Sequence, residues 1–236
     1  MSEAEPVPRS RWRSVWADAL AFIAGLALAW YGEWQTRDLV WSLWLSSLLV
    51  GYAMIVWRIF GPAVMIGTGM WRDRQLLAGE SPVPIVLGGV AYLVGGLFLL
   101  AFFTVHFGMF HFVHSVFLNL FFPAVAGGMK NGPSAGLYLH VLQTYWPFVL
   151  VAAVAERNAF RLDPEASVAT VTQGTTPGKG KGGFDGMMAA YKNVVRLHVL
   201  IFFFAFASFM KVDSFAVYVV VYAVYFFPWR VLRTGK

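Results

Sequence analysis

Residues 83–122 read VPIVLGGVAYLVGGLFLLAFFTVHFGMFHFVHSVFLNLFF, an apolar run of 40 residues without a single Asp, Glu, Lys or Arg. A straight helix of this length would measure about 60 Å, twice the hydrocarbon thickness of a bilayer, which is roughly 30 Å. We therefore expect a long or broken transmembrane helix that tilts, breaks or folds back. Gly108 and Pro123 are the expected break points.

The composition of the whole chain also indicates a membrane protein. Hydrophobic residues make up 58% of the 236 residues and charged residues 13%, whereas a soluble domain carries about 25% charged residues. The chain has no cysteine, which excludes disulfides, thiolate metal sites and lipidated cysteines. Residues 1–14 lack the pattern of a cleavable signal peptide, so we expect the first apolar segment to remain as a helix.

The apolar segments predict an all-α, polytopic membrane protein with six transmembrane helices. The first four helices are expected within residues 15–158 and the last two within 188–231, with cytoplasmic tails at 1–14 and 232–236. Residues 159–187 are rich in Gly, Thr and Lys and are expected to form a flexible cytoplasmic loop. The individual helices are predicted at 15–31, 39–60, within 83–122, and at 134–154, 188–210 and 214–231.

The distribution of basic residues predicts the topology. If the N-terminus is cytoplasmic, 14 of the 18 Lys and Arg fall in cytoplasmic segments and three in outer segments, while Arg196 falls inside the fifth helix. Cytoplasmic loops carry such an excess, so both termini are expected in the cytoplasm. Tryptophans collect at membrane interfaces: Trp34 and Trp41 flank the first outer turn, and Trp57 lies near a cytoplasmic end. The predicted location is the bacterial inner membrane.

The net charge of +6 does not indicate nucleic-acid binding. The basic residues lie at the ends of apolar segments, where they set topology and contact anionic lipid. The sequence GKGKGG at 178–183 has neither the spacing of a phosphate loop nor the Ser or Thr that must follow its lysine. We expect membrane lipids as partners, and neither nucleic acid nor nucleotide. The sequence also leaves open whether the chain forms a homo-oligomer or joins a partner protein in a membrane complex.

Histidines are the main candidate ligands in the chain. On one straight helix His106, His111 and His114 would share a broad face, but His106 and His114 would lie about 12 Å apart along the axis. They could bind one metal ion only if the helix broke. His111 and His114 are spaced i, i+3 and could chelate together. His140 is expected at a similar depth, near the outer surface. Neutral imidazole suits zinc, copper or iron, including haem iron.

A second polar group lies in the fifth predicted helix. Its members are Tyr191, Lys192, Asn193, Arg196 and His198. A guanidinium within the membrane needs a partner, and Asp18, at similar depth in the first helix, is the candidate for an ion pair with Arg196. The simpler interpretation is a structural ion pair. The alternative is a polar cavity for a lipid head group or a proton path.

Three stretches of the chain resemble an uncharacterised family of prokaryotic multi-pass membrane proteins. They are WSLWLSSLLVGYAMIVWRI (41–59), FFTVHFGMFHFVHSVF (102–117) and MAAYKNVVRLHVLIFF (188–203). The residues that match the family pattern are Trp44, His106, Gly108, Phe110, His114, Tyr191 and His198. Ser46 and Ser47 stand where the pattern has Glu and Asn, so a metal site built with that Glu would lack one ligand here. The resemblance implies a membrane architecture but no activity.

These observations favour a non-catalytic membrane protein, either an accessory subunit or a lipid or solute binder, with structural histidines. The alternative is a metal- or haem-binding membrane protein, or a membrane enzyme acting at the outer leaflet. In that alternative His106, His114 and His198 form the core of the site, and His111 and His140 assist. The sequence leaves the question of enzymatic activity open. It requires no cofactor, and a transition metal or haem is the candidate.

Overall fold

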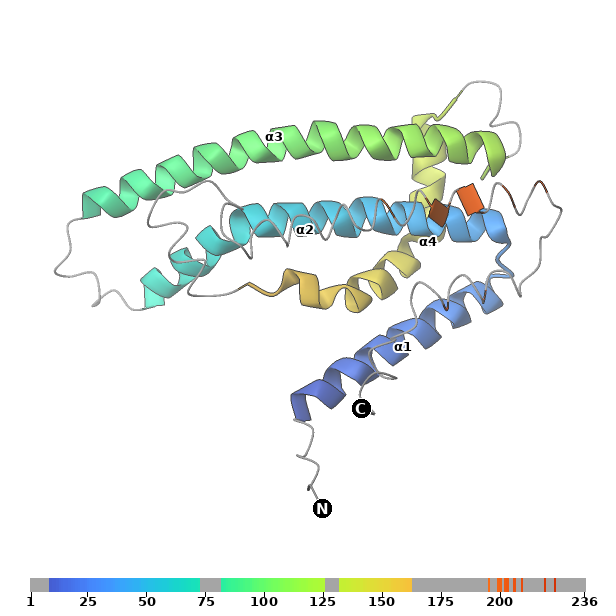
Figure 1. Cartoon of the computed structure of the whole chain (residues 1–236), viewed down its shortest axis with the longest axis horizontal. Helices are drawn as coiled ribbons and strands as arrows, with labels where there is room; N and C mark the ends of the chain where they lie inside the picture. The colour runs from blue at the N-terminus through green and yellow to red at the C-terminus, as the bar shows by residue number, and fades with distance from the viewer. Residues whose placement is uncertain are drawn as a thin grey trace, which may run out of the picture. The chain divides into compact units, whose positions relative to one another are not determined.

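The computed structural model describes residues 9–72, 82–125 and 132–162, and single positions between 195 and 223. Throughout this part the regular structure is helical, which confirms the predicted all-α class (Figure 1). The elements are α1 (Arg9–Tyr31), α2 (Thr36–Arg72), α3 (Pro82–Phe121), α4 (Ala135–Ala155) and the 3-10 helix η3 (Arg157–Phe160). The predicted loop from 163 onward and most of the predicted fifth and sixth helices lie outside the described residues.

Three of the described helices are long and apolar enough to cross a membrane, judged by length and composition. The candidate spans are Thr36–Met65 in α2, Val86–Phe121 in α3 and Ala135–Ala155 in α4. The apolar part of α1, Trp16–Tyr31, is shorter. These three helices support a membrane protein.

α3 is one unbroken helix of 40 residues, which resolves the choice between a long and a broken helix (Figure 1). Gly108 lies inside it, so the break expected there is wrong. A glycine within a helix costs only about 1 kcal/mol, which neighbouring contacts readily offset. The helix ends at Phe121, because Pro123 disfavours helical backbone at the residue before it.

The predicted end of the second helix also needs correction. Helix two was expected to end at residue 60, but α2 continues through Pro62 to Arg72. α4 likewise contains Pro147. α4 starts close to its predicted position because Ser134 is its N-cap: the Ser134 side chain accepts a hydrogen bond from the Leu137 backbone N–H at 3.2 Å.

The described contacts divide into two units. The first unit contains α1, α2 up to Ser46, α3 from Val116 and all of α4. The second contains α2 from Ser47, α3 up to Ser115 and residues 158–162. In the first unit, α1 packs against α4.

A tight turn joins α1 to α2 in the first unit. The Glu33 N–H donates to Trp30 O at 3.2 Å and the Trp34 N–H donates to Ala29 O at 2.9 Å. Glu33 has a φ of 50°, in the left-handed region. This pattern is a Schellman motif, in which glycine is the usual residue at the position of Glu33. The turn therefore holds a strained backbone at a non-glycine residue.

The core of the second unit lies where α2 meets α3. Ile55 and Ile59 from α2 pack with Phe103 and Phe107 from α3, and all four are buried. Gly51 permits this contact, because a Cβ there would lie 2.7 Å from the Phe107 ring. α3 thus presents one stripe to α2.

Candidate functional site

The structure places the three clustered histidines in two environments. His111 and His114 are 1% and 2% exposed, whereas His106 is exposed. His111 follows Phe107 by four residues, so both fall on the stripe that α3 turns toward α2. His106 lies between two aromatic neighbours on its own helix: its ring stacks on Phe102 with centroids 5.5 Å apart and meets Phe110 edge-on at 5.1 Å.

His111 is held at both of its ring nitrogens. Its Nδ1 lies 3.0 Å from the carbonyl oxygen of Phe107, and its Nε2 lies 3.2 Å from the hydroxyl of Ser47. A carbonyl oxygen only accepts, so Nδ1 carries the proton and donates. In the neutral ring Nε2 then accepts from the Ser47 hydroxyl. The imidazole therefore ties α3 to α2 within the second unit.

His114 lies close to this link. Its ring centroid is 6.1 Å from that of His111, with the two rings nearly perpendicular. The next residue, Ser115, is also buried and donates its hydroxyl hydrogen bond to Phe112 O at 2.7 Å. Ser47, His111, His114 and Ser115 together form what we call the α2–α3 polar cluster.

The polar cluster has one arrangement familiar from catalysis, namely a serine hydroxyl bonded to an imidazole that a third group orients. Here the third group is a carbonyl of the same helix, and Ser47 and His111 are only 9% and 1% exposed. A substrate could not reach a serine so enclosed. The arrangement acts chemically as an interhelical hydrogen bond.

Only some of the metal ligands predicted from the sequence lie within the described residues. In the described ranges, no three His, Cys, Asp or Glu side chains gather closely enough to hold a metal ion. His140 is exposed on α4. His198 lies outside the described residues, so the site of His106, His114 and His198 stays a prediction.

Asp18 has a partner that the sequence did not suggest. Its carboxylate accepts a hydrogen bond from the Arg157 guanidinium at 2.5 Å, within the first unit. Arg157 also donates to Val154 O at 2.8 Å, next to the end of α4. Arg196 lies outside the described residues, so the proposed Asp18–Arg196 pair stays a prediction.

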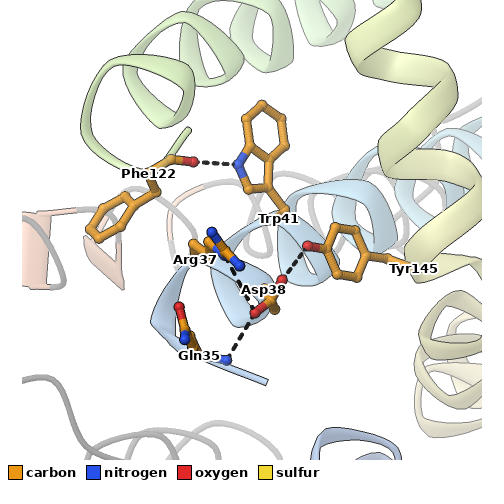
Figure 2. A network of polar contacts seen from close by, with 6 residues as sticks. All are labelled: Gln35, Arg37, Asp38, Trp41, Phe122 and Tyr145. Carbon is orange, nitrogen blue, oxygen red and sulfur yellow. Dashed lines mark hydrogen bonds and ion pairs between the residues drawn. The ribbon is translucent and has the colours of Figure 1, made fainter. Parts of the chain in front are cut away.

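A second polar network, around Asp38, was missed by sequence reasoning (Figure 2). Asp38 Oδ2 accepts from the Gln35 backbone N–H at 2.9 Å and lies 3.8 Å from Arg37 Nε. Asp38 Oδ1 accepts from the buried Tyr145 hydroxyl at 2.6 Å. An acidic residue three positions after a helix N-cap was the available signal. The network fixes the first turn of α2 to α4.

Aromatic side chains surround the Asp38 network. Trp34 meets Tyr145 edge-on, with ring centroids 5.5 Å apart, and packs against Phe148 at 5.7 Å. The indole of Trp41 donates to the carbonyl of Phe122 at 2.7 Å, just past the end of α3 (Figure 2). In the first unit, aromatic side chains and their hydrogen bonds therefore hold the start of α2 in place.

Comparisons with known proteins add a family but no activity. A model for a family of unknown function (DUF6498) matches residues 4–226, nearly the whole chain. No curated protein and no solved structure matches the chain. The chain therefore belongs to the DUF6498 family of unknown function.

Proposed function

We propose that this protein is a non-catalytic, multi-pass protein of the bacterial inner membrane. It has six transmembrane helices and both termini in the cytoplasm. Its partners are membrane lipids, and its buried histidines join helices instead of binding a metal. The basic residues at the ends of apolar segments favour this topology.

The observation that carries the proposal is the hydrogen bonding of His111. Both ring nitrogens already have protein partners, Phe107 O and Ser47 Oγ. Polar side chains that bond across helices are a common means of packing in membranes, worth about 0.6 kcal/mol each on average. His106, by contrast, lies on the exposed side of α3 among phenylalanines. His111 therefore joins two helices, whereas His106 faces the surroundings of α3.

The surface of α3 supports lipid as the main partner. Only 17% of its most apolar window is buried within the protein, and α3 carries no charged residue. Its exposed side chains include Leu87, Val90, Val94, Leu97, Phe98, Phe102, Val105, Met109 and Phe117. Exposed apolar surface of this extent needs an apolar surrounding, and the acyl chains of lipids provide one.

The His111–His114 pair favours a second candidate function, a metal- or haem-binding membrane protein or an outer-leaflet enzyme. Two buried imidazoles with centroids 6.1 Å apart could contribute two ligands to one ion. The only unprotonated nitrogen of His111 is Nε2, so metal binding would displace the Ser47 hydroxyl. Metal binding would therefore break the His111–Ser47 hydrogen bond between α3 and α2, which stays intact in the non-catalytic proposal.

Metal content and the visible absorption spectrum separate the two candidates. The protein is purified in mild detergent without a His-tag, beside one variant with His111→Ala and His114→Ala and a second variant with His106→Ala, which removes a residue of the predicted metal site. We expect only trace metal, and no haem band, in all three samples. Near-stoichiometric metal or haem that is lost in the double variant would overturn the proposal.

The proposed topology can be tested by labelling single introduced cysteines, because the chain has no native cysteine that would also react. Single cysteines are placed by Ser2→Cys, Thr176→Cys, Thr234→Cys and Asn131→Cys. A membrane-impermeant maleimide added to intact cells should label only the cysteine at position 131. Labelling at position 2 or 234 in intact cells would contradict cytoplasmic termini.

A further inference from the structure

Trp57 and Arg58, adjacent on α2, both bind the backbone of η3 in the second unit. The Trp57 indole donates to Phe160 O at 2.6 Å, and the Arg58 guanidinium donates through Nη2 to Ala159 O at 2.6 Å. Gly61 lies one turn further along α2, and a Cβ there would lie 2.8 Å from Leu162. The segment after α4 is therefore docked tightly on this turn of α2.

The position of Arg58 along α2 places it at a membrane interface. Arg58 comes 22 residues after Thr36, the first residue of the helix and of its candidate span, and 22 residues of helix rise about 33 Å. The hydrocarbon core is roughly 30 Å thick. Trp57 beside it is 38% exposed, and exposed tryptophans belong at the level of lipid head groups.

The charge of Arg58 is not balanced by a carboxylate in the described part of its unit. The described residues of the second unit, 47–72, 82–115 and 158–162, include no Asp or Glu. The one partner of Arg58 there is a neutral carbonyl, and its Nε is buried without a hydrogen-bond acceptor among those residues. Charged side chains in membrane segments pair with one another or with backbone carbonyls, and an anionic lipid phosphate would add the opposite charge that Arg58 lacks among those residues. Arg161, exposed just after η3, adds a second cation.

We propose that Arg58, Trp57 and Arg161 form a binding site for the phosphate of an anionic phospholipid at the cytoplasmic interface. Arginine N–H groups donate charge-assisted hydrogen bonds to phosphate oxygens, and the exposed Arg161 can present its planar guanidinium fork to two of these oxygens. The Trp57 ring would pack beside the glycerol region of the lipid. The site rests on the proposed function, since it specifies which lipid the protein selects and where.

Lipid selectivity in native mass spectrometry tests the site. The full chain is extracted from nanodiscs of equal parts phosphatidylglycerol and phosphatidylcholine, and the lipids that remain bound are counted. We expect retention of phosphatidylglycerol over phosphatidylcholine in the native protein. Arg161→Gln should weaken this preference about five-fold, since one basic residue near a surface contributes on that scale, and Arg58→Gln should abolish it.

The matched control is Arg37→Gln, at the start of the same helix. Arg37 is 51% exposed and lies 3.8 Å from Asp38, which balances its charge. Selectivity should survive this change. Equal retention of the two lipids by the native protein, or an equal loss in Arg37→Gln, would overturn the site. Competition by inorganic phosphate alone, as effective as that of the lipid, would also refute a lipid-specific site.

Arg58→Gln also removes a bond to η3, so folding must be monitored by size-exclusion chromatography. If that variant does not fold, Arg161→Gln is the decisive variant, because the side chain of Arg161 is exposed. Unchanged selectivity in Arg161→Gln would then refute the site. If lipid selectivity is absent and the purified protein contains no metal, only the lipid site is rejected. If the purified protein contains near-stoichiometric metal, the proposed function is rejected.

Discussion

His111 Nε2 lies 3.2 Å from Ser47 Oγ, so that one buried imidazole joins α3 to α2. The same ring lies against Phe107, with centroids 4.4 Å apart, and Phe107 in turn occupies the space that Gly51 leaves open. Packing and hydrogen bonding therefore act on the same few turns of the two helices.

The first prediction concerns the coupling between Ser47 and His111. In a double-mutant cycle with Ser47→Ala and His111→Leu, the coupling free energy should be about 0.5–1.5 kcal/mol, the range of interhelical hydrogen bonds in membranes. It is measured by reversible unfolding in mixed detergent. The control cycle pairs Ser47→Ala with His106→Leu and should show no coupling. Equal coupling in both cycles would contradict a direct bond.

The second prediction concerns the close approach at Gly51. Gly51→Ala should destabilise the protein by about 1–3 kcal/mol, because the new methyl group would lie 2.7 Å from the Phe107 ring. The matched control is Gly108→Ala on α3, where a Cβ meets nothing within 4 Å. That change should stabilise by about 0.5–1 kcal/mol through helix propensity. The thermal midpoints of the two variants should shift in opposite directions.

The third prediction concerns the bond from Tyr145 to Asp38. Tyr145→Phe removes a donor to a carboxylate and should cost about 1–3 kcal/mol of unfolding free energy. The control is Tyr31→Phe, since Tyr31 is 86% exposed. If the two variants unfold at the same temperature in detergent, the Asp38 network does not hold α2 to α4.

The fourth prediction concerns the strained turn at Glu33. Glu33→Gly should stabilise the protein by about 1 kcal/mol, because glycine adopts a φ of 50° without steric cost. Glu33→Ala removes the same carboxylate but keeps the Cβ, and so serves as the control. A rise in the thermal midpoint should appear with glycine only. An equal rise with alanine would assign the gain to the lost charge.

Within the described residues, the sequence predicts the positions of the four α-helices and several of their ends, for physical reasons visible at single residues. Ser134 before an apolar run predicts the start of α4, because a serine side chain caps the first turn. The end predicted for the second helix at residue 60 is wrong, since α2 runs on through Pro62 to Arg72. At Gly108, long-range packing of the adjacent Phe107 keeps α3 intact where local propensity suggested a break.

The candidate site was harder to predict than the helices. α3 is apolar on every side, so no hydrophobic face shows which histidine points toward the protein. Burial of His111 and exposure of His106 emerge only from the pairing of α3 with α2. The partners of Asp18 and Asp38, Arg157 and Tyr145, lie more than 100 residues away in the chain. Such pairs leave no signature in local spacing.

The central claim, that the buried histidines join helices and do not bind metal, is tested most directly by thermal unfolding with and without added Zn²⁺ and a strong chelator. A metal that binds the folded state raises its stability in proportion to RT ln(1 + [L]/Kd). We expect the same midpoint under all conditions, and a lower midpoint in His111→Ala that Zn²⁺ does not alter. A midpoint that rises with Zn²⁺ in the native protein, and not in His111→Ala, would contradict the claim.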